Sequence, residues 1–113
     1  FISNIISYRG HELLDGGCAM PIALERSIFD GNDKNIVVLT RDISFRKNPR
    51  PEFPRAALRV KFGDYPNFVD VMMKRPETYN NELELCRRKE KEGNALVIRP
   101  SKPIITGRYE KDF

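Results

Sequence analysis

Tryptophan is absent from this 113-residue chain, histidine occurs once, at His11, and cysteine occurs twice, at Cys18 and Cys86. Two cysteines are too few for a disulfide framework, which favours a reducing, cytoplasmic location. No cysteine and histidine cluster has the spacing of zinc ligands, and no glycine motif of a phosphate-binding loop occurs. We therefore expect neither a metal ion nor a cofactor.

Long hydrophobic runs are also missing. The longest are only a few residues, such as 36–39, so we expect no transmembrane helix. The first nine residues lack the basic segment and the cleavage site of a signal peptide. The chain begins at Phe1 rather than at methionine, and residues 109–113 form no polar tail. We therefore expect a piece of a longer protein, and we leave its oligomeric state open.

Five serines are present, and none of them lies in a Gly-x-Ser-x-Gly sequence: Ser3, Ser7, Ser27, Ser44 and Ser101. That sequence places the nucleophile of α/β hydrolases on a sharp turn between a strand and a helix. If this chain belongs to a serine hydrolase, its nucleophile must lie upstream of Phe1.

The net charge of +4 is concentrated in one stretch. Residues 41–61, the basic stretch, hold seven basic and two acidic side chains, a net charge of 7 − 2 = +5. Aromatic residues interleaved with cations suit an anionic membrane surface or single-stranded nucleic acid. An ordinary solvated loop is the third interpretation and the one that we favour, followed by the membrane and then by nucleic acid, which we do not expect. The candidate surface contacts are Arg46, Lys47 and Arg50.

The first half of the chain predicts a βαβ unit. A strand ends at 12–14, a helix runs from Pro21 to about Phe29 and stops at Gly31, and a β-branched apolar run at 35–40 suits a strand buried on both faces. Strand, helix and strand within about thirty residues imply a parallel sheet with a right-handed crossover.

The second half predicts helices followed by a strand. Residues 41–54 contain three prolines and should be irregular. We expect a helix at 67–74, a second helix opened by Pro76 and ended by Gly93, and a buried strand at 95–98. Residues 104–105 would form a short edge strand.

Asp15 is the most distinctive candidate for a functional residue. It follows the strand that ends at 12–14, and it precedes Gly16 and Gly17, which permit backbone angles closed to other residues. A carboxylate at the C-terminal end of a strand lies where α/β proteins usually place functional groups. The structural interpretation is that Asp15 merely caps a turn or the next helix, and the short motif alone favours it.

His11 could pair with Asp15 or activate the thiol of Cys18. We favour simpler roles for both residues. His11 would be an exposed or hydrogen-bonded histidine near a strand. Cys18 would be a small buried hydrophobe, because no helix N-terminus or basic neighbour obviously lowers its pKa.

Five segments in this order resemble the bacterial branch of the patatin-like phospholipases. They are Leu-Leu-Asp-Gly-Gly at 13–17, Pro-Ile-Ala at 21–23, the stretch 30–41 that begins Asp-Gly-Asn-Asp, Arg-Pro-Glu-Thr-Tyr-Asn at 75–80, and 92–100, which begins Glu-Gly-Asn-Ala. Each segment alone is weak, but together they span nearly the whole chain. At 18–21 this chain has Cys-Ala-Met-Pro, whereas many members place an asparagine shortly after the glycine pair, so its substrate preference stays open.

The resemblance implies an α/β, three-layer fold with a mainly parallel sheet and helices on both faces, of which residues 1–113 would be the C-terminal portion. It also implies a lipid acyl hydrolase with a Ser–Asp dyad, in which Asp15 is the general base and Gly16 and Gly17 shape its turn. The nucleophile elbow and the oxyanion-hole glycines would lie in the N-terminal half, so we expect the isolated chain to be inactive. The alternative is a non-enzymatic module that binds through the basic stretch.

Overall fold

The computed structural model describes residues 4–103 as a mixed α/β structure with two small, separate sheets. A hairpin of β1 (Ile6–Tyr8) and β2 (His11–Leu13) comes first, followed by a short 3-10 helix (Gly16–Cys18), α1 (Leu24–Phe29) and β3 (Asn35–Val38). Helices α2 (Arg55–Phe62) and α3 (Pro66–Lys91) precede the last strand, β4 (Ala95–Ile98). The strand expected at 104–105 lies outside the described residues.

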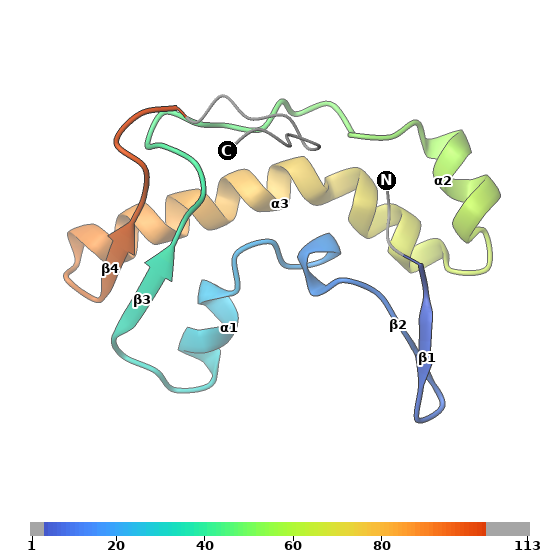
Figure 1. Ribbon diagram of the computed structural model, residues 1–113, viewed down its shortest axis with the longest axis horizontal. Helices are drawn as coiled ribbons and strands as arrows, with labels where there is room; N and C mark the ends of the chain where they lie inside the picture. Colours follow the sequence, from blue (N-terminus) through green and yellow to red (C-terminus); the bar gives the residue numbers. More distant parts are fainter. Residues whose placement is uncertain (1–3, 104–113) are drawn as a thin grey trace, which may run out of the picture.

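Helix α3 connects the two ends of the molecule (Figure 1). Sheet β3–β4 and helix α1 lie at one end, and the β1–β2 hairpin and helix α2 lie at the other. Each end has its own core. Leu24, Leu83, Cys86 and Val97 are among the buried residues of the first core, and Leu58, Phe62, Val69 and Met72 form the second.

The expected strands at 35–40 and 95–98 are present, and they pair with each other in parallel, Asn35 opposite Ala95. The βαβ unit is therefore β3–α2–α3–β4. The prediction that the strand at 12–14 belongs to the same unit is wrong, because β2 pairs antiparallel with β1. The two-residue turn Arg9–Gly10 has φ values of 50° and 78°, a conformation that suits tight hairpins.

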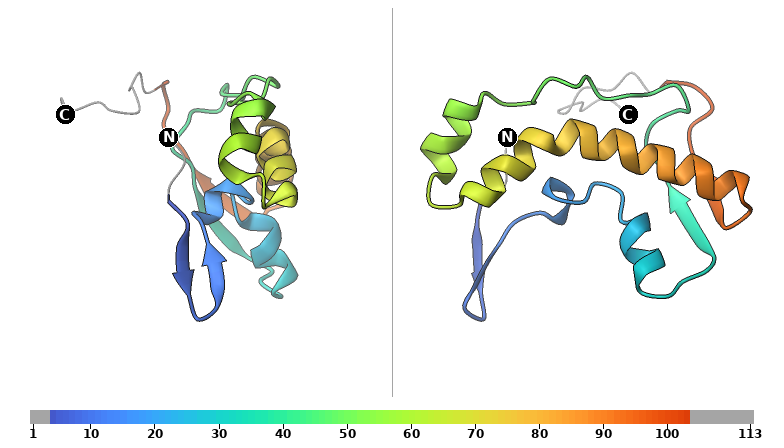
Figure 2. Two further views of the ribbon diagram at one scale, coloured as in Figure 1. Left: turned by 90° about the vertical axis from the view of Figure 1, so that its right-hand side faces the viewer. Right: turned by 180° about the vertical axis from the view of Figure 1, so that it is seen from behind.

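The expectation of a sheet covered on both faces is not met within residues 4–103. Val37, Ala95 and Val97 pack against α1 and α3, and Figure 2 shows both helices on one side of the sheet. The four outward residues are between 51% and 72% exposed: Ile36, Val38, Leu96 and Ile98. No other strand of the described residues pairs with β3 or β4, and a strand pair with one apolar face open to solvent is marginal by itself.

The prediction of two helices separated at Pro76 is also wrong, since one helix runs from Pro66 to Lys91. Proline removes one helical hydrogen bond, and a long helix commonly bends at such a position. Figure 1 shows that α3 arches between its ends. The helix continues because apolar residues on both sides of the buried Pro76 are held in the two cores.

Glu82 is the buried charged residue on α3, and its carboxylate accepts the backbone N–H of Ile22 at 2.8 Å. Burial raises the pKa of Glu82 above its ordinary 4.5, against the opposing effect of that hydrogen bond. A carboxyl group with a raised folded-state pKa stabilises the fold most at low pH, and this contribution is lost as the pH rises through that pKa.

Glutamine at position 82 should escape this loss. The free energy of unfolding of Glu82→Gln minus that of wild type should therefore become more positive as the pH rises from 4.5 to 7. Glutamine keeps the acceptor for Ile22 but carries no charge. Urea unfolding of both proteins at several pH values measures the difference, with Glu77→Gln as the exposed control on the same helix. A difference that is constant with pH, or that falls as the pH rises, would contradict this account.

Candidate active site

Asp15 lies between β2 and the 3-10 helix and is exposed to solvent. We call residues 15–18 the Asp15 turn. One carboxylate oxygen, Oδ1, accepts the backbone N–H of Gly17 at 2.9 Å, and the Asp15 carbonyl accepts the N–H of Cys18 at 3.0 Å. The second carboxylate oxygen has no hydrogen bond or ion pair to the described residues. Asp15 thus caps its turn and still offers one free oxygen to an incoming proton donor.

The glycines of the Asp15 turn serve it differently from the expectation. Neither Gly16 nor Gly17 has a positive φ, so left-handed backbone angles are not what the turn requires. A Cβ atom added at Gly17 would lie 3.3 Å from Oδ1 of Asp15, a tight contact, whereas a Cβ at Gly16 meets nothing. Gly17 leaves room for the carboxylate that its own N–H holds.

Arg75 of α3 ties the Asp15 turn to the body of the molecule. Its Nε donates to the Gly17 carbonyl at 2.9 Å, and its guanidinium NH1 lies 2.7 Å from Oε1 of Glu52. Lys47 pairs with the same oxygen of Glu52. Neither Arg75 nor Glu52 is a predicted site residue. Arg75 lies in the segment 75–80 that resembles the patatin-like family, but nothing in that segment indicates a contact with Gly17.

The basic stretch is attached to α3 along most of its length. The backbone N–H of Lys47 donates to Oδ1 of Asn80 at 2.9 Å, and Nδ2 of Asn80 donates to the carbonyl of Lys47 at 3.0 Å. The side-chain amide of Asn80 thus pairs with the backbone of Lys47 as a neighbouring strand would. Arg46 pairs with Glu84 at 2.7 Å, and the Phe45 ring meets Tyr79 edge-on. Figures 1 and 2 show residues 41–54 running beside α3.

This attachment changes two expectations about the basic stretch. Residues 55–62 are not a loop but helix α2, which Ala56, Ala57 and Leu58 favour intrinsically. Arg46 and Lys47 already have carboxylate partners, so much of the positive charge is neutralised within the molecule. Among the three candidate surface contacts, Arg50 has no ion pair to the described residues. The three side chains do border one open hollow, together with Arg41.

His11 and Cys18 do not form a reactive pair. His11 lies in β2 opposite Tyr8, and among residues 4–103 no hydrogen bond joins it to Asp15 or Cys18. Burial raises the pKa of the Cys18 thiol, and the Asp15 carboxylate raises it further against the lowering effect of Arg75. A raised pKa keeps the thiol protonated and unreactive, as the interpretation of Cys18 as a small hydrophobe requires.

No serine hydroxyl of the described residues bonds to Asp15. The one Ser–Asp contact there is Ser44 with Asp42, two residues apart in an exposed turn, where Asp42 accepts both the N–H and the hydroxyl of Ser44. The hydroxyl and N–H donors lower the pKa of Asp42 and so make it a weaker base. This contact is local turn structure.

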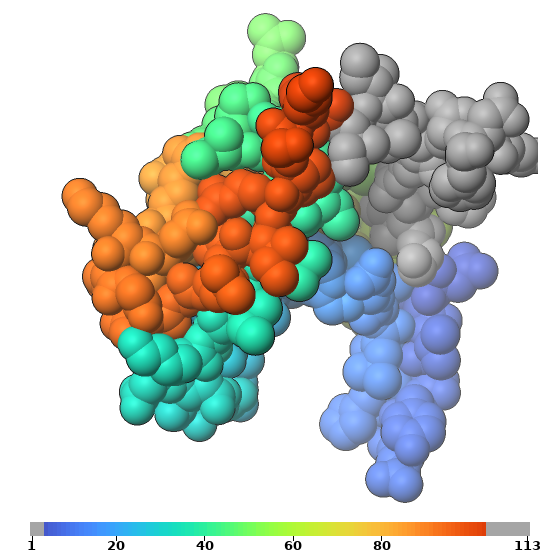
Figure 3. Space-filling view, turned by 60° about the vertical axis from the view of Figure 1, so that its left-hand side comes forward, coloured from blue at the N-terminus to red at the C-terminus, as the bar shows by residue number. Residues whose placement is uncertain are grey.

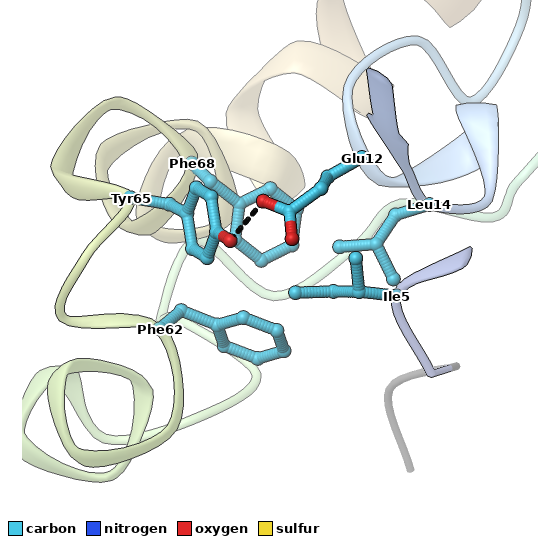
Figure 4. Close-up of a pocket in the computed structure, with 6 residues that line it drawn as sticks. All are labelled: Ile5, Glu12, Leu14, Phe62, Tyr65 and Phe68. Atoms are coloured by element: carbon cyan, nitrogen blue, oxygen red, sulfur yellow. Dashed lines mark hydrogen bonds between the residues drawn. The ribbon is translucent and has the colours of Figure 1, made fainter. Parts of the chain in front are cut away.

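A cavity of about 170 Å³ lies between the hairpin and the junction of α2 and α3 (Figure 4). Its walls are mostly apolar: Ile5, Glu12, Leu14, Phe62, Tyr65 and Phe68. The Tyr65 hydroxyl donates to the Glu12 carboxylate, and this bond raises the pKa of Tyr65. Leu14 directly precedes Asp15, so packing around the cavity fixes the entry to the Asp15 turn.

Residues 4–103 contain no group of three acidic, cysteine or histidine side chains placed to hold a metal ion. None of the helices in this range combines the length and the apolar character that crossing a membrane demands. The hairpin projects from the body, as Figure 3 shows, and leaves the Asp15 turn at its base.

Comparison with known families gives one match. Residues 65–113 match the model of a domain of unknown function (DUF6363), which is less than half of the chain. The matched region contains α3, and with it Arg75, but not Asp15. The curated proteins and the solved structures yield no match.

Proposed function

We propose that this chain is the C-terminal part of a patatin-like lipid acyl hydrolase and that Asp15 is its general base. The observation that carries the proposal is the carboxylate of Asp15. One oxygen is fixed by the Gly17 N–H, the other has no partner among the described residues, and the whole group is exposed at the end of a strand.

In the proposed reaction, a serine upstream of Phe1 donates its proton to Asp15 as its Oγ attacks the carbonyl carbon of a lipid ester. Asp15 passes that proton to the leaving alkoxide, so the alcohol departs neutral, the carboxylate is restored and an acyl-enzyme ester remains. A water molecule then gives a proton to Asp15 and attacks that ester. Asp15 returns this proton to the serine oxygen as the fatty acid is released, which restores both the serine and the carboxylate. The N–H of Gly17 holds the base in place, and the resemblance assigns the oxyanion hole to the upstream half.

The uncovered face of sheet β3–β4 supports this proposal. Ile36, Val38, Leu96 and Ile98 present an apolar surface, and no further strand of residues 4–103 pairs with either edge of this sheet. Parallel sheets in proteins are covered on both faces. Further strands and a helical layer from the upstream half would supply the missing neighbours and complete a three-layer fold.

The alternative, a non-enzymatic module that binds through the basic stretch, has less support. Its best cations, Arg46 and Lys47, are committed to Glu84 and Glu52. In the hydrolase proposal the same region has a secondary part: Arg50, Arg46 and Lys47 would touch the headgroups of an anionic membrane that holds the substrate. Ordinary screening makes such contacts weaker at high salt.

A fluorophosphonate probe, which phosphonylates activated serines, tests the proposal in the full-length protein. We expect labelling of one serine that lies upstream of Phe1, and hydrolysis of a lipid ester that the label abolishes. The isolated 113-residue chain should neither react nor hydrolyse the ester above the rate of a denatured control. Hydrolysis by the isolated chain, or full-length protein that neither labels nor turns over any ester tested, would refute the proposal.

A further inference from the structure

The Asp15 turn packs on the second core through Cys18 and the preceding Leu14, but Asp15 itself is exposed. The hairpin before it is exposed along both strands, and the 3-10 helix has no buried residue. A general base must be held within a fraction of an ångström of its target, and a misplacement of 1 Å costs about a hundredfold in rate. The packing of Leu14 and Cys18 is apolar and therefore non-directional, so a directional contact from the folded body is needed to fix the orientation of this turn.

Arg75 makes that contact. Its side chain is 20% exposed, and it projects from the middle of α3, between the two cores. Nε binds the carbonyl of Gly17, the residue whose N–H binds the Asp15 carboxylate. One peptide segment thus connects the guanidinium to the base. A planar guanidinium with several fixed donors suits two acceptors held in different directions.

Glu52 holds the other end of the guanidinium. Its Oε1 lies 2.7 Å from Arg75 NH1, and the same oxygen pairs with Lys47. Lys47 is itself bonded through its backbone to Asn80, one turn further along α3. Glu52, which orients Arg75, is therefore itself held by Lys47, and Lys47 is anchored to α3 through Asn80.

We propose that Arg75, oriented by Glu52, is a positioning residue that holds the Asp15 turn against α3. This inference rests on the proposed function of Asp15 and adds to it the residue that gives the base its place. Arg75 touches neither substrate nor nucleophile, and it acts through the Gly17 carbonyl.

The test uses Arg75→Ala in the full-length protein, with two readouts. The kcat for ester hydrolysis should fall by at least about tenfold while KM changes little, since the substrate contacts stay in place. Amide hydrogen exchange of the peptide that spans residues 15–20 should accelerate by at least about tenfold, the lower end of what losing one charge-assisted hydrogen bond implies. Arg75→Lys should lie between wild type and Arg75→Ala, because a single ammonium group cannot span both acceptors.

Arg99→Ala is the matched control. Arg99 also pairs with a glutamate, Glu90, and is 13% exposed, but it follows β4 and has no bond to the Asp15 turn. Neither readout should change there. If Arg75→Ala does not fold, Glu52→Gln provides the same test, with a smaller effect in the same direction.

The outcomes separate this inference from the proposed function. Unchanged exchange in residues 15–20 of Arg75→Ala overturns the inference whatever Asp15 does. The inference is also overturned if Arg75→Ala shows faster hydrogen exchange in residues 15–20 but a normal kcat, while Asp15→Asn is inactive. Arg75 would then hold the turn without placing the base. Normal turnover by Asp15→Asn refutes the proposed function itself, and the inference falls with it.

Discussion

Asp15→Asn in the full-length protein should lower kcat for lipid ester hydrolysis by at least about a hundredfold, the usual contribution of a general base. Asparagine keeps an oxygen that can accept the Gly17 N–H, so the turn should persist. What it loses is the ability to take a proton from the serine. KM should change little, because Asp15 acts in the transition state and not in binding.

Asp42→Asn is the control that the chain offers. Asp42 also accepts the N–H of a residue two positions ahead, Ser44, at the same 2.9 Å as Asp15 and Gly17. Both substitutions therefore replace the carboxylate of an exposed turn by its amide. Wild-type turnover by Asp42→Asn alongside loss in Asp15→Asn would identify the charge of Asp15 as the cause. Near-normal turnover by Asp15→Asn would show that Asp15 has only a structural part.

Phe62→Ala should lower the free energy of unfolding by about 3–5 kcal/mol, the usual cost of truncating a core aromatic residue. Phe62 is 2% exposed in the core that joins α2 to α3. Its ring meets the ring of Phe68 edge-on, with 4.8 Å between the ring centroids. It also lines the cavity beside Leu14. The loss should appear as a lower urea midpoint with an unchanged m-value.

Val60→Ala is the matched comparison, because Val60 lies on the same helix and is 89% exposed. Its effect should stay within about 0.5 kcal/mol. Equal effects of the two substitutions would mean that α2 does not pack on α3 through Phe62. Because α3 carries Arg75, Phe62→Ala should also increase hydrogen exchange in residues 15–20, at urea concentrations below those that unfold the protein.

Local sequence signals predicted the elements that depend on local chemistry. The strand at 95–98 has the predicted bounds, and the strand at 35–40 is present as Asn35–Val38. The last helix stops where a glycine with φ of 74° follows it, at Gly93. The two strands lie in apolar runs, and the helix is a run of helix-forming residues that a glycine follows.

Tertiary packing overrode the local signals elsewhere. Proline at 76 predicts a helix boundary, but burial on both sides of Pro76 keeps α3 continuous. The sequence predicts that a strand ending at 12–14 lies in one sheet with β3. The strand found there, β2, pairs instead with the strand directly before it through the Arg9–Gly10 turn. A two-residue hairpin closes a shorter loop than any distant pairing, and that loop costs less entropy.

In the candidate site, too, the sequence predicts the residue that depends on local chemistry and not the residue that depends on a distant contact. Asp15 can be found from the sequence because its strand, its carboxylate and its glycines are adjacent. Arg75 cannot, because its partner Gly17 lies 58 residues away and no local pattern encodes that distance. Glu52 looked like one of two acids in a basic stretch, yet in the structure it is the shared partner of Lys47 and Arg75.

The most direct test is the crystal structure of the full-length protein, with the nucleophile identified by the fluorophosphonate label. We expect a serine upstream of Phe1 whose Oγ lies about 2.6–3.2 Å from Oδ2 of Asp15, the carboxylate oxygen that does not bind the Gly17 N–H. We also expect that Arg75 still binds the Gly17 carbonyl. A labelled serine that is out of reach of Asp15 and paired with a histidine or another carboxylate would contradict the account.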